Sequence, residues 1–185
     1  MRAPNSRRIR TIELVLIALM AAVLCIVGPV TIPVGVVPVS TVIVVLYLIT
    51  YILGTWRAAL SCLIYLCIGM IGLPVFAGYS AGPAVLFGPT GGYLIGYLLL
   101  IVCSGLCIGR SGKKLFHLIG MMAGLFGCYS VGTAWLMWQS ELSLLQAVMT
   151  GVMPFVIFDL FKIGAALLVG PMFQKYLRKT NILTS

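Results

Sequence analysis

Residues 11–27 read TIELVLIALMAAVLCIV, and this stretch indicates what kind of chain follows. It is almost wholly apolar, carries its one charge at Glu13, and is stopped by Gly28-Pro29. Basic residues precede it, as in a secretory signal peptide, but the run is long for the apolar core of a signal and no A-x-A cleavage site follows. The stretch therefore predicts a retained transmembrane helix over 12–28.

The rest of the chain has the same character. Of its 185 residues, 62% are hydrophobic and 8% are charged, against about 25% charged in soluble domains. Six membrane helices of about 20 residues would use about 120 residues, which excludes a water-soluble enzyme and a disordered or collagen-like chain. The sequence predicts one all-α integral membrane domain over 1–185. Its bundle of six transmembrane helices is expected at about 12–28, 40–55, 57–74, 93–109, 115–138 and 147–173.

The basic residues support this division. All of them except Lys162 lie before the first span or in every second loop after it: Arg2, Arg7, Arg8, Arg10, Arg57, Arg110, Lys113, Lys114, Lys175, Arg178 and Lys179. The other loops, 29–39, 77–92 and 139–146, hold none. Because Lys and Arg mark cytoplasmic loops, both termini are expected in the cytoplasm. Topology and contacts with membrane lipid account for the net charge of +9, so nucleic acid is not an expected partner.

Asp159 and Lys162 depart from this pattern, because they lie within the sixth apolar span. A charge at the centre of a membrane helix costs about 2.5–3.5 kcal/mol, and the i, i+3 spacing places both side chains on one helix face. Two interpretations remain open: an ion pair that locks the bundle, or a polar contact site for a ligand. The second is favoured, because ionisable residues inside a membrane usually serve a function.

The outer segment 72–93 reads GLPVFAGYSAGPAVLFGPTGGY. Its glycines allow close backbone approach and its aromatic residues offer apolar walls, so it is either a ligand-binding mouth or an interfacial turn. It lacks the phosphate-binding G-x-x-x-x-G-K-[ST] pattern. No cluster of metal-ligating residues and no catalytic set can be assembled, so no catalytic residue, metal or cofactor is expected. Ala18 and Ala22, four residues apart, would let another helix approach closely.

Together these segments resemble the BioY family, the biotin-specific substrate-binding subunits (S components) of energy-coupling factor (ECF) transporters. The matching pieces are Gly72-Leu-Pro-Val-Phe-Ala-Gly78, Gly88-Pro-Thr-Gly-Gly-Tyr93 and Asp159-x-x-Lys162. The resemblance implies a multi-pass protein of a prokaryotic cell membrane that captures biotin from outside and is not an enzyme. It also implies an ECF transmembrane coupling subunit and two cytoplasmic ATPase subunits as partners, with Ala18 and Ala22 as the docking face.

The chemistry of biotin suggests how such a site would work. Its ureido ring has two N–H donors and a carbonyl acceptor, which suit Asp159 and Lys162 respectively. The apolar chain and thioether would lie against Phe76, Leu86 and Phe87. The carboxylate could meet the hydroxyls of Tyr79, Ser80 or Thr90, backbone amides, or Lys162 itself. The expected ligand-binding residues are Asp159, Lys162, Phe76, Gly78, Tyr79, Ser80, Leu86, Phe87, Gly88, Thr90 and Tyr93.

Two other functions are alternatives to vitamin capture. A stand-alone proton-coupled carrier for a small organic acid would use Asp159 as a proton relay and would need no ATP. An oligomeric ion channel is disfavoured, because one Asp/Lys pair carries little net charge with which to select ions.

Overall fold

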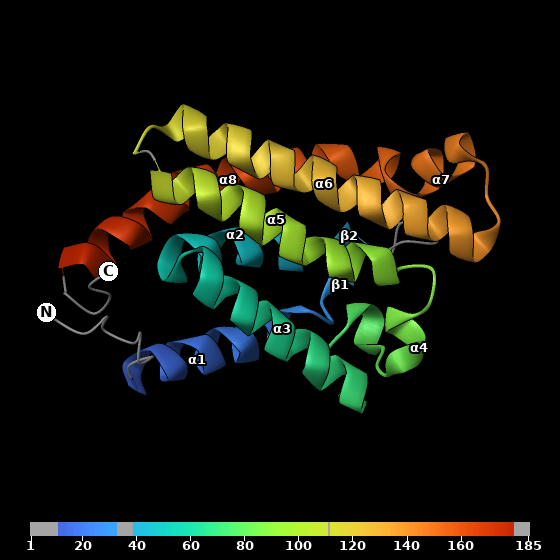
Figure 1. The fold of residues 1–185 in the computed structure, drawn as a ribbon, viewed down its shortest axis with the longest axis horizontal. Coiled ribbons are helices and arrows are strands. Elements are labelled where there is room, and N and C mark those ends of the chain that lie inside the picture. The colour runs from blue at the N-terminus through green and yellow to red at the C-terminus, as the bar shows by residue number, and fades with distance from the viewer. Residues whose placement is uncertain (1–10, 33–38, 111, 180–185) are drawn as a thin grey trace, which may run out of the picture.

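The protein is described by a computed structural model that covers residues 11–32, 39–110 and 112–179. It is a bundle of helices with a small β-ladder between the first two (Figure 1). In chain order the elements are α1 Thr11–Val27, β1 Thr31–Ile32, β2 Val39–Ser40, α2 Val42–Leu53, α3 Thr55–Ile71, a 3₁₀ helix Ala77–Tyr79, α4 Pro83–Leu86, α5 Gly91–Arg110, α6 Lys114–Ser140, α7 Leu144–Gly151 and α8 Met153–Lys179.

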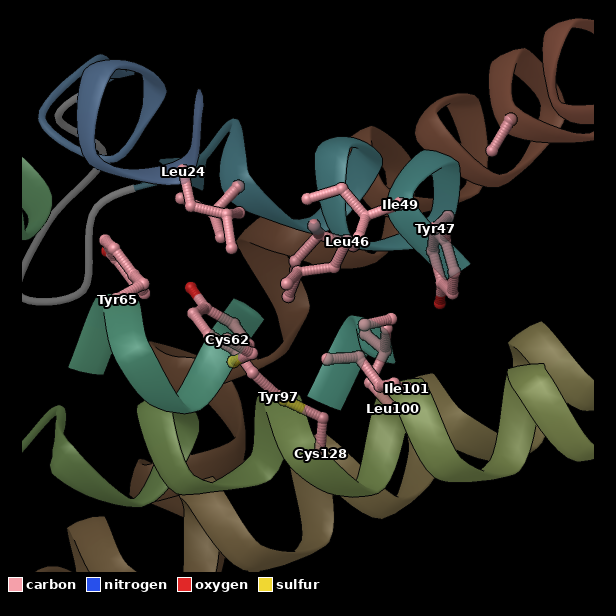
Figure 2. Packing of buried hydrophobic residues seen from close by; sticks show 14 of the residues in the cluster. Leu24, Leu46, Tyr47, Ile49, Cys62, Tyr65, Tyr97, Leu100, Ile101 and Cys128 are labelled. Atoms are coloured by element: carbon pink, nitrogen blue, oxygen red, sulfur yellow. The ribbon is translucent and has the colours of Figure 1, made fainter. Parts of the chain in front are cut away.

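Helix α2 lies at the centre of the bundle. It contacts α1, α3, α5 and α8, and its side chains at Leu46 and Tyr47 are completely buried. A helix that is apolar on all sides is stable only where other elements surround it. Figure 2 shows Leu24 of α1, Leu46 of α2, Tyr65 of α3 and Leu100 of α5 converging on one cluster. This core joins the first half of the chain to α5.

The helices differ in how far they can reach across a membrane. Gly91–Arg110, Lys114–Ser140 and Met153–Tyr176 are long and apolar enough to cross one. Helices α1, α2 and α3 are apolar but have 17, 12 and 17 residues, so α2 rises only about 18 Å.

Backbone at membrane depth must be hydrogen-bonded or buried in protein. Ahead of α2, β1 and β2 pair Thr31 with Ser40, and the Thr41 hydroxyl donates to the carbonyl oxygen of Val30 at 2.7 Å.

Helices α5 and α6 run side by side along the bundle (Figure 1). Glycines permit the close approach: a Cβ on Gly124 would lie 2.8 Å from the carbonyl oxygen of Leu100, and one on Gly96 would lie 2.9 Å from the Cys128 sulfur. Small residues at a membrane-helix interface allow backbones to pack directly. Tyr93 and Tyr97 of α5 and Tyr129 of α6 line a common cavity beside this packed pair of helices.

The last expected span, 147–173, is wrong as a single helix. The structure has α7 over Leu144–Gly151 and α8 over Met153–Lys179, separated by Val152, whose φ of −127° and ψ of −55° leave the helix. Pro154 explains the break, because its ring lacks an N–H and crowds the preceding turn, while it fits the first turn of a new helix. Asp159 therefore lies about 9 Å from the beginning of its helix, and not about 18 Å as a helix from 147 would require.

Candidate functional site

Asp159 and Lys162 of α8 form a buried ion pair. Lys162 Nζ lies 2.6 Å from Asp159 Oδ1, and the two side chains are 14% and 2% exposed. Lys162 Nζ also donates to the backbone oxygen of Ser40 at 2.7 Å. The i, i+3 spacing explains the first contact. The second ties α8 to β2, a segment far away in sequence.

Tyr129 completes the polar network. Its hydroxyl donates to Asp159 Oδ2 at 2.5 Å, so Tyr129 and Lys162 each hold one of the two carboxylate oxygens. Sequence reasoning missed both Tyr129 and Ser40. No motif marks either residue, because their roles arise from contacts between α6, β2 and α8 that local patterns do not encode.

Two adjoining cavities open onto this network. The larger has a volume of about 280 Å³ and lies between the outer segment and α5; it is lined by Ser40, Phe76, Ala77, Ser80, Ala84, Val85, Gly88, Pro89, Thr90, Tyr93, Leu94 and Tyr97. The smaller, about 50 Å³, is lined by Ser40, Ile43, Tyr93, Tyr97, Cys128, Tyr129, Gly151, Phe155 and Asp159. Because Ser40, Tyr93 and Tyr97 line both, the two cavities are adjacent and make up one candidate site, with Asp159 in the smaller cavity at its inner end.

The structure brings only some of the expected residues to this site. Those that line the larger cavity are Phe76, Ser80, Gly88, Thr90 and Tyr93, and those that line the smaller are Tyr93 and Asp159. Lys162 lines neither cavity but contacts Asp159 and Ser40, which do. Gly78, Tyr79, Leu86 and Phe87 line neither cavity.

Tyr79 and Phe87 lie outside both cavities and are exposed. Tyr79 has a φ of 62°, in the left-handed region that non-glycine residues seldom adopt, and its side chain is 71% exposed. Phe87 follows the short helix α4 and is 63% exposed. Both residues thus lie outside the two cavities, and their contact with a ligand stays a prediction.

The outer segment is held in place by packing and by hydrogen bonds to the bundle. The segment expected as a loop over 77–92 contains the 3₁₀ helix and α4. Phe76 is fully buried and stacks edge-on against Tyr65, with ring centroids 5.6 Å apart. Its ring occupies the space where a side chain at Gly69 would lie. Near the other end of the segment, Trp135 of α6 donates from Nε1 to the carbonyl oxygen of Gly88 at 3.0 Å.

This arrangement suits reversible binding of a small molecule. The larger, mostly apolar cavity adjoins the smaller one, which is lined by the buried carboxylate of Asp159 with the ammonium group of Lys162 paired to it. An amphiphilic ligand could place its polar head there. Within the described part of the chain, no group of three or more His, Cys, Asp or Glu residues could hold a metal ion.

Ala18 and Ala22 lie away from this site. Helix α1 buries Ile17, Ala21 and Leu24 against the bundle, and Ala18 and Ala22 are exposed on its other side. The described structure therefore leaves this pair of small residues accessible to a partner helix.

Comparisons with known proteins agree in family and in fold. A family model described as the BioY family matches residues 2–179. Biotin transporter BioY2 of Lactococcus lactis subsp. cremoris is 32% identical over 174 residues, covering 91% of this chain and 93% of the relative. Biotin transporter BioY of Thermotoga maritima is 32% identical over 163 residues, covering 88% and 96%. A crystal structure of the S-component for biotin from an ECF-type ABC transporter aligns with a TM-score of 0.80 and 27% identity, covering 94% of this chain and 95% of the other.

Proposed function

The chain belongs to the BioY family, and on that premise we propose that it is the biotin-specific S component of an ECF-type transporter. It is a multi-pass membrane transport component and not an enzyme. It binds biotin, and the energy for uptake comes from other subunits.

The observation that carries this proposal is the buried Asp159–Lys162 pair, whose carboxylate lines the smaller cavity beside a larger one with uncharged walls. A cyclic urea presents N–H donors beside a carbonyl acceptor, and the pair presents an acceptor beside a donor. A polar head that pairs with both groups leaves no buried charge without a partner. The apolar walls, Phe76 among them, then enclose the rest of the ligand.

The remaining expectations extend this proposal. The chain forms a single integral membrane domain with both termini in the cytoplasm, and it works with a transmembrane coupling subunit and two cytoplasmic ATPase subunits. The exposed Ala18 and Ala22 on α1 support a docking surface for the coupling subunit, since small residues allow close helix packing.

The test is equilibrium binding of labelled biotin to the purified chain in detergent, with unlabelled biotin, thiamine and riboflavin as competitors. We expect saturable binding that only biotin displaces. Asp159→Asn and Lys162→Ala should each weaken it by about 2–5 kcal/mol, because each leaves the other group buried without its charge partner.

Glu13→Gln is the matched control. Glu13 accepts from Arg57 at 2.7 Å in a second ion pair between α1 and α3, and neither residue lines a cavity. Its loss should leave biotin affinity unchanged. Absence of biotin binding in a folded sample, or equal displacement by thiamine, would contradict the proposed function.

A further inference from the structure

Positive charge is distributed very unevenly along this chain. Residues 11–56, 58–109, 115–161 and 163–174 contain no Lys or Arg at all. Where the structure describes the other basic positions, they lie at the start of α3, the end of α5, the start of α6 and the last turns of α8. These helix ends lie at one end of the bundle, and α4 and α7 lie at the other (Figure 1). The outer end of the site, beside α4, is thus far from all the described basic side chains at the other end of the bundle. Lys162 is the one described basic residue outside that group.

The larger cavity has neutral walls. Its lining residues are apolar or glycine, apart from the hydroxyls of Ser40, Ser80, Thr90, Tyr93 and Tyr97. The Ser80 hydroxyl already donates to the carbonyl oxygen of Ala77 at 2.7 Å. Ala84 and Pro89 line the cavity and are exposed, so this end is accessible to water. A ligand group there meets a few neutral dipoles and solvent, and no ammonium or guanidinium among the described residues.

Lys162 is poorly suited to bind a ligand carboxylate. Its ammonium group lies 2.6 Å from Asp159 Oδ1, so the charge of the pair is already balanced. A second carboxylate beside Nζ would also lie close to that of Asp159, and like charges in a buried site repel strongly. A neutral carbonyl acceptor can use the ammonium group without this cost. The polar head of the ligand therefore belongs at Asp159 and Lys162, and its charged tail belongs at the neutral outer end.

We propose that this chain also binds biotin derivatives whose tail is uncharged, namely amides and esters of the carboxyl group. The inference rests on the proposed function and extends its ligands from biotin to biotin amides and esters. A site that pairs the carboxylate with a cation loses a factor of about thirty or more when that pair is broken. Here no such pair is available, and a neutral amide gives up less hydration than a carboxylate on entering.

The test compares four ligands on the wild-type chain in detergent: biotin, biotin primary amide, biotin methyl ester and biotin methylated on a ureido nitrogen. We expect the dissociation constants of the amide and the ester to lie within about tenfold of that of biotin. The ureido-methylated ligand should lose more than tenfold, because it cannot present both N–H donors. A loss above tenfold for the amide would overturn the inference and would place the carboxylate at a cation.

A variant pair checks where the tail lies. Ala84→Lys adds a cation at the exposed rim, and Ala84→Met adds a side chain of similar length without charge. The preference for biotin over its amide should rise at least threefold in Ala84→Lys and stay at the wild-type value in Ala84→Met. An unchanged preference in Ala84→Lys would contradict this location of the tail. If either variant does not fold, the wild-type ratios still decide the inference.

The two proposals fail in different ways. If labelled biotin does not bind to the wild-type chain, the proposed function itself is contradicted. If biotin binds tightly and the amide does not, the chain remains a biotin-binding component and only the broader substrate class is lost.

Discussion

Asp159 is held from two sides before any ligand arrives. Lys162 contacts Oδ1 and the Tyr129 hydroxyl donates to Oδ2, which fixes the plane of the carboxylate. An ionised carboxylate has about four acceptor positions, so both oxygens can still accept N–H donors from a ligand. A preorganised acceptor pays less ordering cost on binding than a freely rotating one. We therefore expect Tyr129 to act as a positioning residue for Asp159.

Tyr129→Phe should weaken biotin binding by about tenfold, because a hydrogen bond to a charged group is worth about 1.5–3 kcal/mol and part of it serves orientation. The measurement is equilibrium biotin binding. If Tyr129 acts through Asp159, the affinity ratio between biotin and ureido-methylated biotin should also be smaller in this variant than in the wild type. A purely structural role of Tyr129 would leave this ratio unchanged.

Tyr51→Phe is the matched control for this substitution. The Tyr51 hydroxyl lies 3.0 Å from His117 Nδ1 in another buried contact between helices, and Tyr51 lines neither cavity. Its loss should leave the affinity and the methylation penalty unchanged. If Tyr129→Phe and Tyr51→Phe had equal effects on biotin binding, the positioning role of Tyr129 would be contradicted.

At the scale of elements, the site is a surface of the bundle covered by the segment between α3 and α5. This segment is too short and too irregular to hold its own shape. It is ordered by contacts with its neighbours: Phe76 packs over Gly69 of α3, and the Gly82 amide donates to the Gly69 carbonyl oxygen at 2.8 Å. Phe76 can therefore form this wall of the cavity only because residue 69 has no side chain.

Gly69→Ala should weaken biotin binding and lower the unfolding free energy by about 1–3 kcal/mol, the usual cost of overpacking. The added Cβ would lie 2.1 Å from Phe76 Cζ, so the ring must leave its position. Thermal unfolding and biotin binding measure the two effects.

Gly127→Ala provides the comparison within α6. Its Cβ would meet its nearest neighbour, Leu99 Cβ, at 3.9 Å, an ordinary contact. Alanine favours a helix interior over glycine, so this substitution should not reduce stability or affinity. If Gly69→Ala behaved like Gly127→Ala, the packing account of the wall would be wrong.

At the scale of the whole molecule, the proposed ligand site and the proposed docking face lie on different helices. The cavities of the proposed site lie among α2, α4, α5, α6 and α8. Ala18 and Ala22 lie on the exposed side of α1, which packs on α3 and α2. Figure 1 shows α1 and α6 at opposite sides of the bundle. A change at the exposed face of α1 can therefore act on a partner without touching the ligand.

Ala22→Trp should leave biotin affinity of the isolated chain unchanged and strongly reduce ATP-dependent biotin uptake with the coupling module, because the indole prevents close helix approach. Ala123→Trp makes the same change at an exposed alanine of α6 and should leave uptake near the wild-type level. Normal uptake with Ala22→Trp would contradict the docking surface proposed on α1.

The sequence alone determined the class of the protein and its family resemblance, and it singled out Asp159 and Lys162 as candidate ligand contacts. These conclusions depend on local properties: the length of apolar runs, the placement of rare charges, and an i, i+3 spacing that any helix converts into a shared face. The family comparison and the structural alignment confirm the all-α membrane fold and the biotin-specific S component.

Only the tertiary structure decided which residues surround the site. It brought Tyr129 and Ser40 to Asp159 and Lys162, turned Phe76 inward while leaving Phe87 exposed, and divided the expected last span at Val152. The physical reason is that each outcome depends on contacts between segments far apart in the chain. Neither the pattern of one segment nor its propensity contains the position of the neighbour that it will meet.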